Sequence, residues 1–357
     1  MINTAFSRTT RALCLIVALG AFAVPSVAGA ATRKPVRRAT VSRTVQAPAK
    51  KTVVRKRTSR VARPAARKAV IQARQLREVL QPRYKLDAAG SLVPDPRAEA
   101  AIIYNPQNGQ VLWEENSKNQ RSIASITKVM TATVFLEDDP DLTREVVVDP
   151  RDVRAASTTH LRAGYRVTND NLLHLLLIAS DNAAARALAR NSRYGYEGFI
   201  ARMNEKAKEL GLESTSYTDP SGLLSDNVSS AYDMAKLITF ATGDERIGSI
   251  MRTQYYSFNV GRQTVSVHST NQLVMRGDVD VVGGKTGFIS KAGYCLATLL
   301  RLPQGGPQVA VVVLGARSNA GRFWETRHLF NWLSTKAQDL LPALAASESA
   351  AAGSAAN

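Results

Sequence analysis

The sequence predicts an α/β (α+β) fold, in which an antiparallel sheet is flanked by helices and accompanied by a helical cluster. Strand-like segments occur near both ends of the stretch between about residues 94 and 341, and helical segments lie between them. Because secondary-structure elements pack in layers around a shared core, we expect the two terminal sets of strands to complete a single sheet. One globular domain over residues 89–341 follows from this pattern.

Residues 1–30 have the pattern of a secretory signal peptide. Arg8 and Arg11 precede an apolar run over residues 12–24, and Ala28-Gly29-Ala30 offers a small-residue cleavage site. This run is shorter than the ~20 apolar residues that a membrane-spanning helix needs, which favours cleavage after Ala30 over retention as an anchor. The sequence therefore predicts export to the periplasm, with any attachment to membrane or wall being peripheral.

Positive charge is concentrated directly after this signal. Residues 31–85 hold eighteen Lys and Arg and one acid, Glu78, so the net charge of +18 comes almost wholly from this leader. High charge with few apolar residues predicts disorder over residues 31–88. The leader is either a solvated linker or a tether to anionic envelope polymers or lipids. A tether would hold the protein on such anionic surfaces, and added salt would weaken this retention. Nucleic acid is excluded as a partner because the signal directs the chain away from it.

Two short apolar runs predict an early hairpin. Residues 100–104 and 111–113 are strand-like and are joined at Asn108-Gly109, which is typical of tight hairpin turns. The helices expected next cover residues 125–137, 171–179, 182–189 and 196–210. Asp181 or Asn182 is expected to cap the third of these helices, and Gly211 to end the fourth.

The second half of the domain supplies the remaining strands. A turn at residues 219–222 and a helix beginning at Ser229 or Ser230 come first. The strand-like segments are residues 254–260, 263–268, 279–282, 293–300 and 308–314. An amphipathic helix over residues 321–340 should dock on the sheet, because its acidic residues do not suit a membrane-surface anchor. The Ala/Ser-rich tail, residues 342–357, is expected to be disordered.

Ser125 and Lys128 stand at the head of an apolar helix, one helical turn apart. Residues i and i+3 of an α-helix are neighbours with Cβ atoms roughly 5–6 Å apart, so the amine can reach the hydroxyl. A serine is a weak nucleophile without a nearby base, and a lysine becomes that base only where burial or a second cation lowers its pKa. The pair indicates acyl transfer by an activated serine, although S-x-x-K also arises by chance.

Two later polar triplets strengthen this interpretation. Ser180-Asp181-Asn182 falls where one helix ends and the next begins, and Lys285-Thr286-Gly287 falls in a strand-like segment before Phe288. Singly, each motif admits a structural explanation, as a helix cap, a capped turn or a charged residue that protects a strand edge. Together, three polar motifs at element boundaries within apolar surroundings favour one shared catalytic cleft.

With these motifs, the chain resembles the penicillin-recognising serine enzymes, which share S-x-x-K, S-D-N and K-T-G segments. More narrowly, it is similar to the low-molecular-mass penicillin-binding proteins of the D-alanyl-D-alanine carboxypeptidase/endopeptidase family. The similarity extends over about residues 95–335 and is carried by residues 123–132, 219–223, 227–231 and 285–288. It implies a DD-peptidase/β-lactamase-like fold for the catalytic domain.

The resemblance implies a catalytic role for three residues. Ser125 would attack the carbonyl between two D-alanines and form an acyl-enzyme. Lys128 would be the general base, and Ser180 would relay a proton to the leaving amine. Water or an amine would then release the acyl group.

The same resemblance implies how substrate is bound. Asn182 would hold the peptide amide, while Lys285 and Thr286 would bind the terminal carboxylate. Gly287 would let the substrate lie against the strand, and the backbone N–H groups of the nucleophile and of Phe288 would form the oxyanion hole. The implied substrates are peptidoglycan stem peptides, and β-lactam antibiotics would act as covalent inhibitors. No cofactor and no metal are implied.

The subgroup within the family stays open between carboxypeptidase and endopeptidase. Residues 270–274 and 291–296 resemble the endopeptidase branch. The carboxypeptidase branch commonly carries a further β-domain and an amphipathic anchor, for which this chain leaves no room after residue 341. Both activities are therefore retained as expectations.

Other functions fit the sequence less well. A β-lactamase would need a deacylating glutamate in an E-x-x-L-N loop, which is absent downstream of Ser180. Gly277 lies too far from Lys285 for a P-loop, and the four histidines are scattered without an H-E-x-x-H motif for zinc. A catalytically silent wall-binding protein remains an alternative, but the intact Ser125 and Lys128 argue against it.

Overall fold

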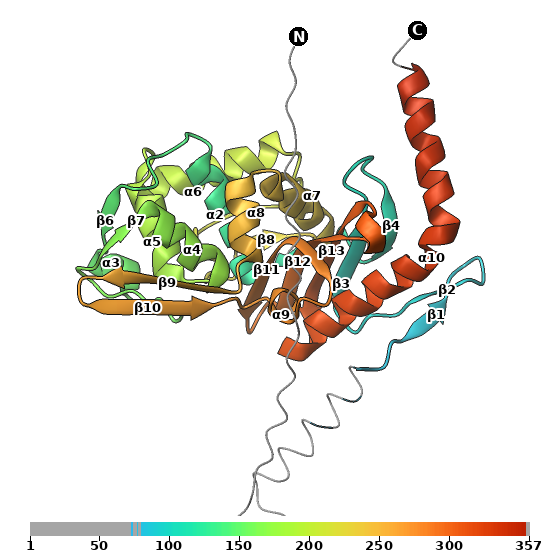
Figure 1. The fold of residues 1–357 in the computed structure, drawn as a ribbon, viewed down its shortest axis with the longest axis horizontal. Helices are drawn as coiled ribbons and strands as arrows, with labels where there is room; N and C mark the ends of the chain where they lie inside the picture. Colours follow the sequence, from blue (N-terminus) through green and yellow to red (C-terminus); the bar gives the residue numbers. More distant parts are fainter. Residues whose placement is uncertain (1–72, 74–76, 78–79, 355–357) are drawn as a thin grey trace, which may run out of the picture. The chain divides into compact units, whose positions relative to one another are not determined.

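The central element of the fold is a five-stranded antiparallel sheet with the strand order β11-β12-β13-β3-β4 (Figure 1). The computed structural model describes Ala73, Arg77 and residues 80–354, with side chains described up to Lys336. The predicted signal peptide and most of the basic leader lie outside these residues and stay predictions. The strands of the sheet are β3 (Ala100–Tyr104), β4 (Val111–Glu115), β11 (Asp280–Ile289), β12 (Gly293–Arg301) and β13 (Gln308–Ala316).

Strands from the two ends of the domain meet in the middle of this sheet, as the sequence predicts. Ile102 of β3 pairs with Val312 of β13, and all residues of β13 after the first are buried. A strand buried on both faces has a continuous apolar sequence, and β13 shows this pattern. The predicted strand over residues 279–282 is the beginning of the longer β11, which also contains the K-T-G residues.

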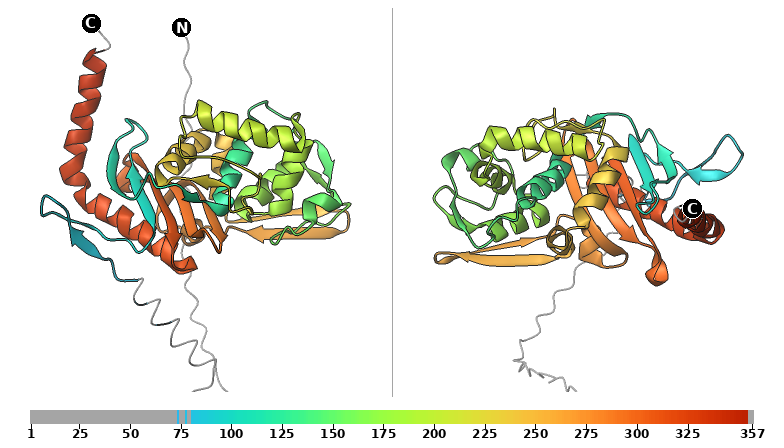
Figure 2. Two further views of the ribbon diagram at one scale, coloured as in Figure 1. Left: turned by 180° about the vertical axis from the view of Figure 1, so that it is seen from behind. Right: turned by 90° about the horizontal axis from the view of Figure 1, so that it is seen from above.

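Alternate side chains of the sheet enter two different apolar cores. Ile102 and Val312 pack with the helical cluster, while Ile103 and Val313 pack with Phe323 and neighbouring residues of α10 (Asn319–Ser354). Figure 2 shows α10 crossing the side of the sheet opposite the helical cluster. The predicted docking of the closing helix on the sheet is thus confirmed. The helix continues to Ser354, beyond the expected end at residue 340, since its alanine-rich sequence favours helix. The predicted disorder of the tail over residues 342–357 is therefore wrong as far as Ser354.

Helix α2 (Thr127–Leu136) forms the centre of the helical cluster, and all of its residues are buried. The predicted helix start at Ser125 is wrong in detail, because Ala124–Ile126 forms a short 3-10 turn, η1, before α2 begins. Asp181 caps its helix by accepting a hydrogen bond from the Ala184 N–H at 3.0 Å, and Ser230 caps the helix predicted to begin at Ser229 or Ser230. The surrounding helices are α4 (Asn169–Ile178), α5 (Asn182–Asn191), α6 (Gly195–Glu209) and α7 (Ala231–Thr242).

Among the described residues, three helices were not expected from the sequence. Two of them are very short, and the third lies between segments with stronger helix and strand patterns. These helices are α3 (Pro150–Val153), α8 (Glu245–Arg252) and α9 (Gln272–Arg276). A second short 3-10 turn is η2 (Pro303–Gly305). Within the residues that the structure describes, no helix combines the length and the apolar character that crossing a bilayer requires.

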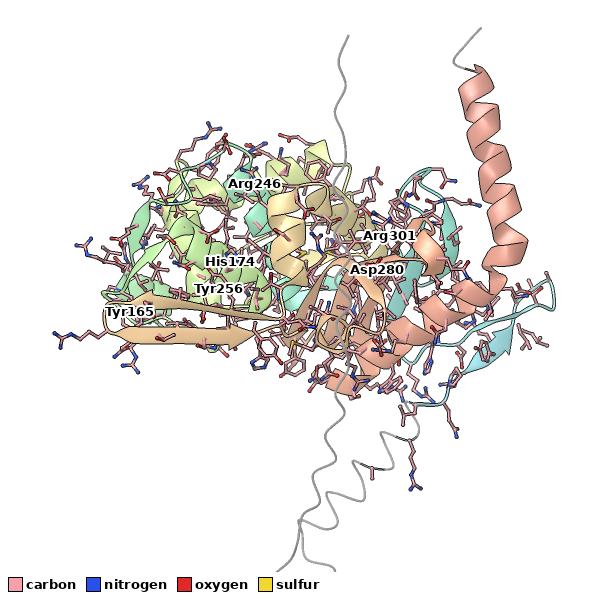
Figure 3. All side chains as sticks on the ribbon, viewed as in Figure 1. Tyr165, His174, Arg246, Tyr256, Asp280 and Arg301 are labelled. Carbon is pink, nitrogen blue, oxygen red and sulfur yellow. The ribbon has the colours of Figure 1, made fainter. Side chains whose placement is uncertain are left out.

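Among the described residues there are four two-stranded sheets besides the main sheet, and the predicted pairing across Gly261-Arg262 is confirmed in one of them. His174 of α4 stacks on Tyr256 of that hairpin with ring centroids 3.9 Å apart, and both are labelled in Figure 3. The strand pairs are β1 (Tyr84–Leu86) with β2 (Leu92–Pro94), β5 (Arg121–Ser122) with β8 (Val228–Ser229), β6 (Glu145–Val147) with β7 (Arg166–Thr168), and β9 (Tyr255–Val260) with β10 (Gln263–His268).

Strand β1 lies inside the segment that the sequence assigns to the disordered leader, so the boundary at residue 88 falls too late. The physical reason is a local turn. The Asp87 carboxylate accepts hydrogen bonds from the N–H groups of Ala89 and Ser91, at 2.9 and 2.8 Å, and Gly90 has a φ of +78°. This turn folds β1 back on β2 despite the basic composition that precedes it.

Candidate active site

The serine and the lysine of the first motif are in direct contact. Ser125 lies in η1, and the Lys128 Nζ donates a hydrogen bond to the Ser125 Oγ over 3.0 Å. Ala124, directly before the serine, has a φ of +49°, a left-handed conformation that costs energy for a residue with a side chain. The chain therefore turns sharply at this point, and the turn presents the serine hydroxyl to the lysine.

Lys128 is fully buried, and three oxygen atoms surround its nitrogen. Besides the serine, Nζ donates to the Asn182 Oδ1 over 2.6 Å and to the carbonyl of Ser221. Burial lowers the pKa of Lys128 to about 7, while the carboxylates of Asp219 and Asp181 oppose this shift. A substantial fraction of neutral amine is thus present near neutral pH, and this form can accept the proton of the serine hydroxyl.

The carbonyl of Ser221 belongs to the predicted turn at residues 219–222, to which the sequence assigned no catalytic contact. The Asp219 carboxylate shapes this turn by accepting hydrogen bonds from the N–H groups of Ser221, Gly222 and Leu224 and from the Asn227 Nδ2, at 2.6 to 2.9 Å. Because these bonds hold the turn together, the Ser221 carbonyl is fixed in front of the lysine. A contact made by a backbone carbonyl does not depend on the side chain at that position, so the residue types did not indicate it.

Gly222 lets this turn lie directly against the nucleophile. Its φ is +78°, and a Cβ atom at this position would lie 2.1 Å from the carbonyl oxygen of Ala124. Only a residue without a side chain fits here, because the neighbouring atom belongs to the backbone and cannot rotate away.

We expect the substitution Gly222→Ala to destabilise the protein by roughly 2–5 kcal/mol, through backbone strain and overpacking together. Thermal unfolding should show a fall in Tm of roughly 5–15 °C. Gly261→Ala is the matched control, since Gly261 has a φ of +58° but no heavy atom within 4 Å of the added carbon. An equal loss of Tm in both variants would contradict the close approach described here.

The second and third motifs also meet. The Lys285 Nζ donates hydrogen bonds to the Ser180 Oγ over 2.8 Å and to the Thr286 carbonyl over 2.9 Å. Ser180 has a φ of +61°, so it is strained in the same way as Ala124 on the other side of the site. Burial, together with the positive charges of Lys128 and Arg322, holds the pKa of Lys285 well below its usual value.

Strand β11 runs directly past the nucleophile turn. A Cβ atom at Gly287 would lie 2.7 Å from the Ile123 carbonyl oxygen and 3.1 Å from the Ser125 nitrogen, so the glycine is required for this approach. The hydroxyls of Thr286 and Thr270 share a hydrogen bond of 2.7 Å. The half-exposed ring of Phe288 stacks on Tyr294, with centroids 4.2 Å apart.

A cavity of about 410 Å³ collects the predicted residues. Of the sequence-predicted set, it is lined by Ser125, Ser180, Asn182, Thr286, Gly287 and Phe288. The two buried lysines reach this cavity through the hydroxyls that they contact. None of the described residues that line the cavity carries a carboxylate. The cavity therefore offers hydroxyl groups and no negative charge, which suits an anionic ligand.

Asn182 uses both ends of its side-chain amide within the protein. Its Oδ1 accepts from Lys128, and its Nδ2 donates to the Ala156 carbonyl over 2.7 Å. The structure therefore gives Asn182 a positioning contact with the lysine. The contact with a substrate amide that the family resemblance implies stays a prediction.

Arg322 of α10 is a lining residue that the sequence analysis did not identify. Its Nη1 donates to the carbonyls of Gly287 and Cys295, at 2.9 and 3.2 Å, and burial lowers its pKa to about 10. It adds a positive charge behind the K-T-G strand. No sequence signal near Arg322 links it to the motifs, because α10 follows β11 by two further strands.

Comparison with known proteins identifies the family. A family described as D-alanyl-D-alanine carboxypeptidase, peptidase S11, matches residues 88–318 of the chain. The chain belongs to this family. The peptidase S11 resemblance that the three motifs carried is thereby confirmed, and the chain is a serine-type hydrolase.

Curated relatives of this peptidase S11 chain carry both subgroup names. It is 32% identical over 258 residues to the D-alanyl-D-alanine endopeptidase of Escherichia coli (strain K12), covering 71% of this chain and 83% of that protein. The endopeptidase of Haemophilus influenzae is 33% identical, over 63% of this chain and 78% of that protein. The E. coli carboxypeptidase DacC is 32% identical, over 67% of this chain and 62% of that protein.

Solved structures confirm the fold expected of a peptidase S11 member. The Streptomyces K15 DD-transpeptidase is 28% identical with a TM-score of 0.63, over 67% of this chain and 97% of that protein. A D-alanyl-D-alanine carboxypeptidase from Mycobacterium tuberculosis H37Rv is 29% identical with the same TM-score, over 70% and 95% of the two chains. The predicted α/β architecture therefore has close structural counterparts among DD-peptidases.

Proposed function

We propose that this peptidase S11 chain cleaves the peptide bond that follows a D-alanine in peptidoglycan stem peptides, through an acyl-enzyme on Ser125. The single observation that carries the proposal is the hydrogen bond of 3.0 Å between the Ser125 Oγ and a buried lysine amine. Lys285 and Ser180 line the far side of the same site, joined over 2.8 Å. A nucleophile, a base and a lysine whose protonated form binds the substrate carboxylate are thus assembled.

The proposed acylation step begins with neutral Lys128, which takes the proton of the Ser125 hydroxyl as its oxygen attacks the carbonyl carbon. The backbone N–H groups of Ser125 and Phe288 stabilise the oxyanion of the tetrahedral intermediate. Its collapse breaks the C–N bond, and the leaving amine takes a proton through the Ser180 hydroxyl, while Lys128 gives up the proton that it took from Ser125 and is neutral again. Water then attacks the ester, which restores the serine and releases the shortened peptide.

Substrate orientation in this proposal comes from the cations on the β11 side. The terminal carboxylate of the substrate is bound by Lys285 and by the Thr286 hydroxyl, with the charge of Arg322 behind them. Asn182 holds Lys128 in place from the opposite wall. β-Lactam antibiotics carry a carboxylate next to a reactive amide and acylate the same serine in this proposal.

Among the two subgroup activities, we propose endopeptidase cleavage of cross-linked peptides as the main one. The resemblance of residues 270–274 and 291–296 to the endopeptidase branch supports this choice. The proposal includes export to the periplasm, which rests on the predicted signal peptide alone. Attachment of the basic leader to anionic lipids or wall polymers also stays a prediction, which rests on the positive charge of residues 31–85.

The test compares two purified muropeptides, a cross-linked dimer and an uncross-linked pentapeptide, with products identified by mass spectrometry. We expect conversion of the dimer to monomers to be faster than release of D-alanine from the pentapeptide. Faster release of D-alanine would instead establish carboxypeptidase as the main activity. Rapid hydrolysis of a reporter cephalosporin with neither peptide cleaved would overturn the peptidase proposal in favour of a β-lactamase.

A further inference from the structure

A second cavity, of about 590 Å³, lies beside the catalytic one. It is bounded by α3, by α5, by the beginning of α6 and by the turn at residues 219–224. Leu223 lines both cavities, so the two are neighbours that share one wall. A ligand that extends from the nucleophile past Leu223 would enter the second cavity.

Helix α5 connects the two cavities. Residues four apart lie on the same face of a helix, so Asn182, Arg186 and Arg190 form one row along α5. Asn182 contacts Lys128 in the catalytic cavity, and both arginines line the second cavity. Arg186 is therefore the next side chain outward from the catalytic site, about 5–6 Å further along the helix. The two sites are close enough for the charge of Arg186 to help lower the pKa of Lys128.

Most charges around the second cavity are already neutralised within the protein. Arg190 binds the Asp152 carboxylate through two hydrogen bonds, of 2.7 and 3.1 Å. Arg151 pairs with Asp149. Asp219, another acid in the wall, accepts three hydrogen bonds from N–H groups of its own turn and one from the Asn227 side chain, so its oxygens already have partners.

Arg186 lacks such a partner. It donates through Nη1 to two backbone carbonyls, those of Asp152 at 3.2 Å and Arg154 at 2.7 Å. Among the residues that the structure describes, no carboxylate forms an ion pair with it; the exposed Glu197 lines the same cavity without a contact to it. Three arginines and three carboxylates line the cavity, and Arg186 is the arginine whose described hydrogen bonds go to backbone carbonyls and not to a carboxylate.

We propose that this second cavity is a subsite for a free carboxylate on the substrate peptide, upstream of the scissile bond, with Arg186 as its cationic partner. The inference rests on the proposed function, because it assumes a peptide held at Ser125. In the proposed function the downstream carboxylate is bound on the β11 side by Lys285, so we assign the opposite direction, past Leu223 toward α5, to the upstream residues. Tyr196, which also lines the cavity, offers a ring and a hydroxyl beside the guanidinium.

The spacing along α5 limits where this carboxylate can be. One helical turn is about 5.4 Å, and an extended peptide advances about 3.3–3.6 Å per residue. With the residue that acylates the serine placed beside Asn182, the carboxylate should therefore be carried by a side chain about two residues before it. A diamino acid with a free carboxylate, or a glutamate, at that position has the required chemistry.

The test uses two synthetic peptides that end in D-Ala-D-Ala and differ at one group. One carries a side-chain carboxylate about two residues upstream, and the other carries the corresponding carboxamide. For the unmodified protein we expect kcat/KM to favour the carboxylate peptide roughly tenfold or more, as for a hydrogen bond between charged groups. In Arg186→Gln this ratio should fall to nearly one, while Arg186→Lys should keep part of it.

Two further variants make the result independent of any folding defect in Arg186→Gln. Leu224→Glu places a negative charge at the rim, where Leu224 is 52% exposed, and should reduce or reverse the preference. Arg193→Gln is the matched control, because Arg193 pairs with Asp138 and lines a different cavity. It should leave the ratio unchanged.

The outcomes separate this inference from the proposed function. If the unmodified protein cleaves both peptides with equal kcat/KM, or if Arg186→Gln and Leu224→Glu keep its preference, the subsite is refuted and the peptidase activity stands. If neither peptide is cleaved and no penicillin adduct forms, both the proposed function and the subsite fail. A preference that disappears in both variants but survives in Arg193→Gln supports the subsite.

Discussion

Replacement of Ser125 with alanine is expected to abolish covalent labelling by a fluorescent penicillin and to lower kcat/KM for D-Ala-D-Ala peptides by at least about 10⁴-fold. The variant loses the only atom that can form the acyl-enzyme in this mechanism. Loss of one hydroxyl at a surface-accessible cavity wall should hardly change stability, so Tm should stay within about 2 °C of the parent. Gel fluorescence, peptide turnover and thermal unfolding together provide the measurement.

Ser249→Ala is the matched control for this prediction. Ser249 lies on α8, its hydroxyl donates only to the Arg246 carbonyl, and it does not line the catalytic cavity. The control should label and turn over substrate like the parent. Retained peptide cleavage in Ser125→Ala would show that another group is the nucleophile, and mass spectrometry of the penicillin adduct would identify it.

Replacement of Lys128 with methionine is expected to slow acylation by about 10²–10⁴-fold, because it removes the general base but keeps the nucleophile. Methionine is close to lysine in length and fits a buried site, although the Asn182 Oδ1 and the Ser221 carbonyl lose their donor. Such unpaired acceptors cost roughly 1–3 kcal/mol each, so some loss of Tm is expected too. Stopped-flow acylation by a penicillin measures the rate directly.

The pH dependence of acylation tests the same role in the unmodified protein. Only the neutral amine can accept the serine proton, and the pKa of Lys128 is lowered to about 7. Below that pH the lysine is protonated and acylation should be slow; above it the neutral form dominates and the rate should reach a plateau. The rise should therefore be centred near pH 7, and it should be missing in Lys128→Met.

Lys236→Met is the control for the lysine prediction. Lys236 is half-buried on α7 and does not line the catalytic cavity, and its Nζ donates to the Gly211 carbonyl over 2.7 Å. Its replacement should alter neither the rate nor the pH profile. A pH profile in Lys128→Met that still rises near pH 7 would assign the base to a different group, and Lys285, whose pKa is also lowered, would be the first to examine.

Much of the fold follows from short-range sequence patterns. The Asn108-Gly109 hairpin, the Asp181 and Ser230 caps and the continuous apolar strand β13 depend on neighbours in the chain, so they could be predicted residue by residue. Such elements are set by local hydrogen bonding and by which side chains need burial. The short helices α3 and α9 were missed because they have too few residues to show a period.

The three polar motifs could also be recognised in the sequence, because they combine characteristic residue types at fixed spacings. That the three motifs meet in one cavity was a hypothesis, because the order of residues along the chain does not show which distant segments are in contact. Ser180 and Lys285 are separated by 105 residues and are joined by a single hydrogen bond. Only the antiparallel sheet, which places β11 beside the nucleophile turn, brings them together.

The sequence by itself determined the family, the candidate pair Ser125 and Lys128, and the closing of one sheet by strands from both ends of the domain. The tertiary structure alone decided the electrostatics. The lowered pKa of Lys128, the Ser221 carbonyl that faces it, the charge of Arg322 and the unpaired Arg186 all arise from segments distant in the chain. The physical reason is that the energy of a charge depends on how much water and how many dipoles surround it, and folding sets both.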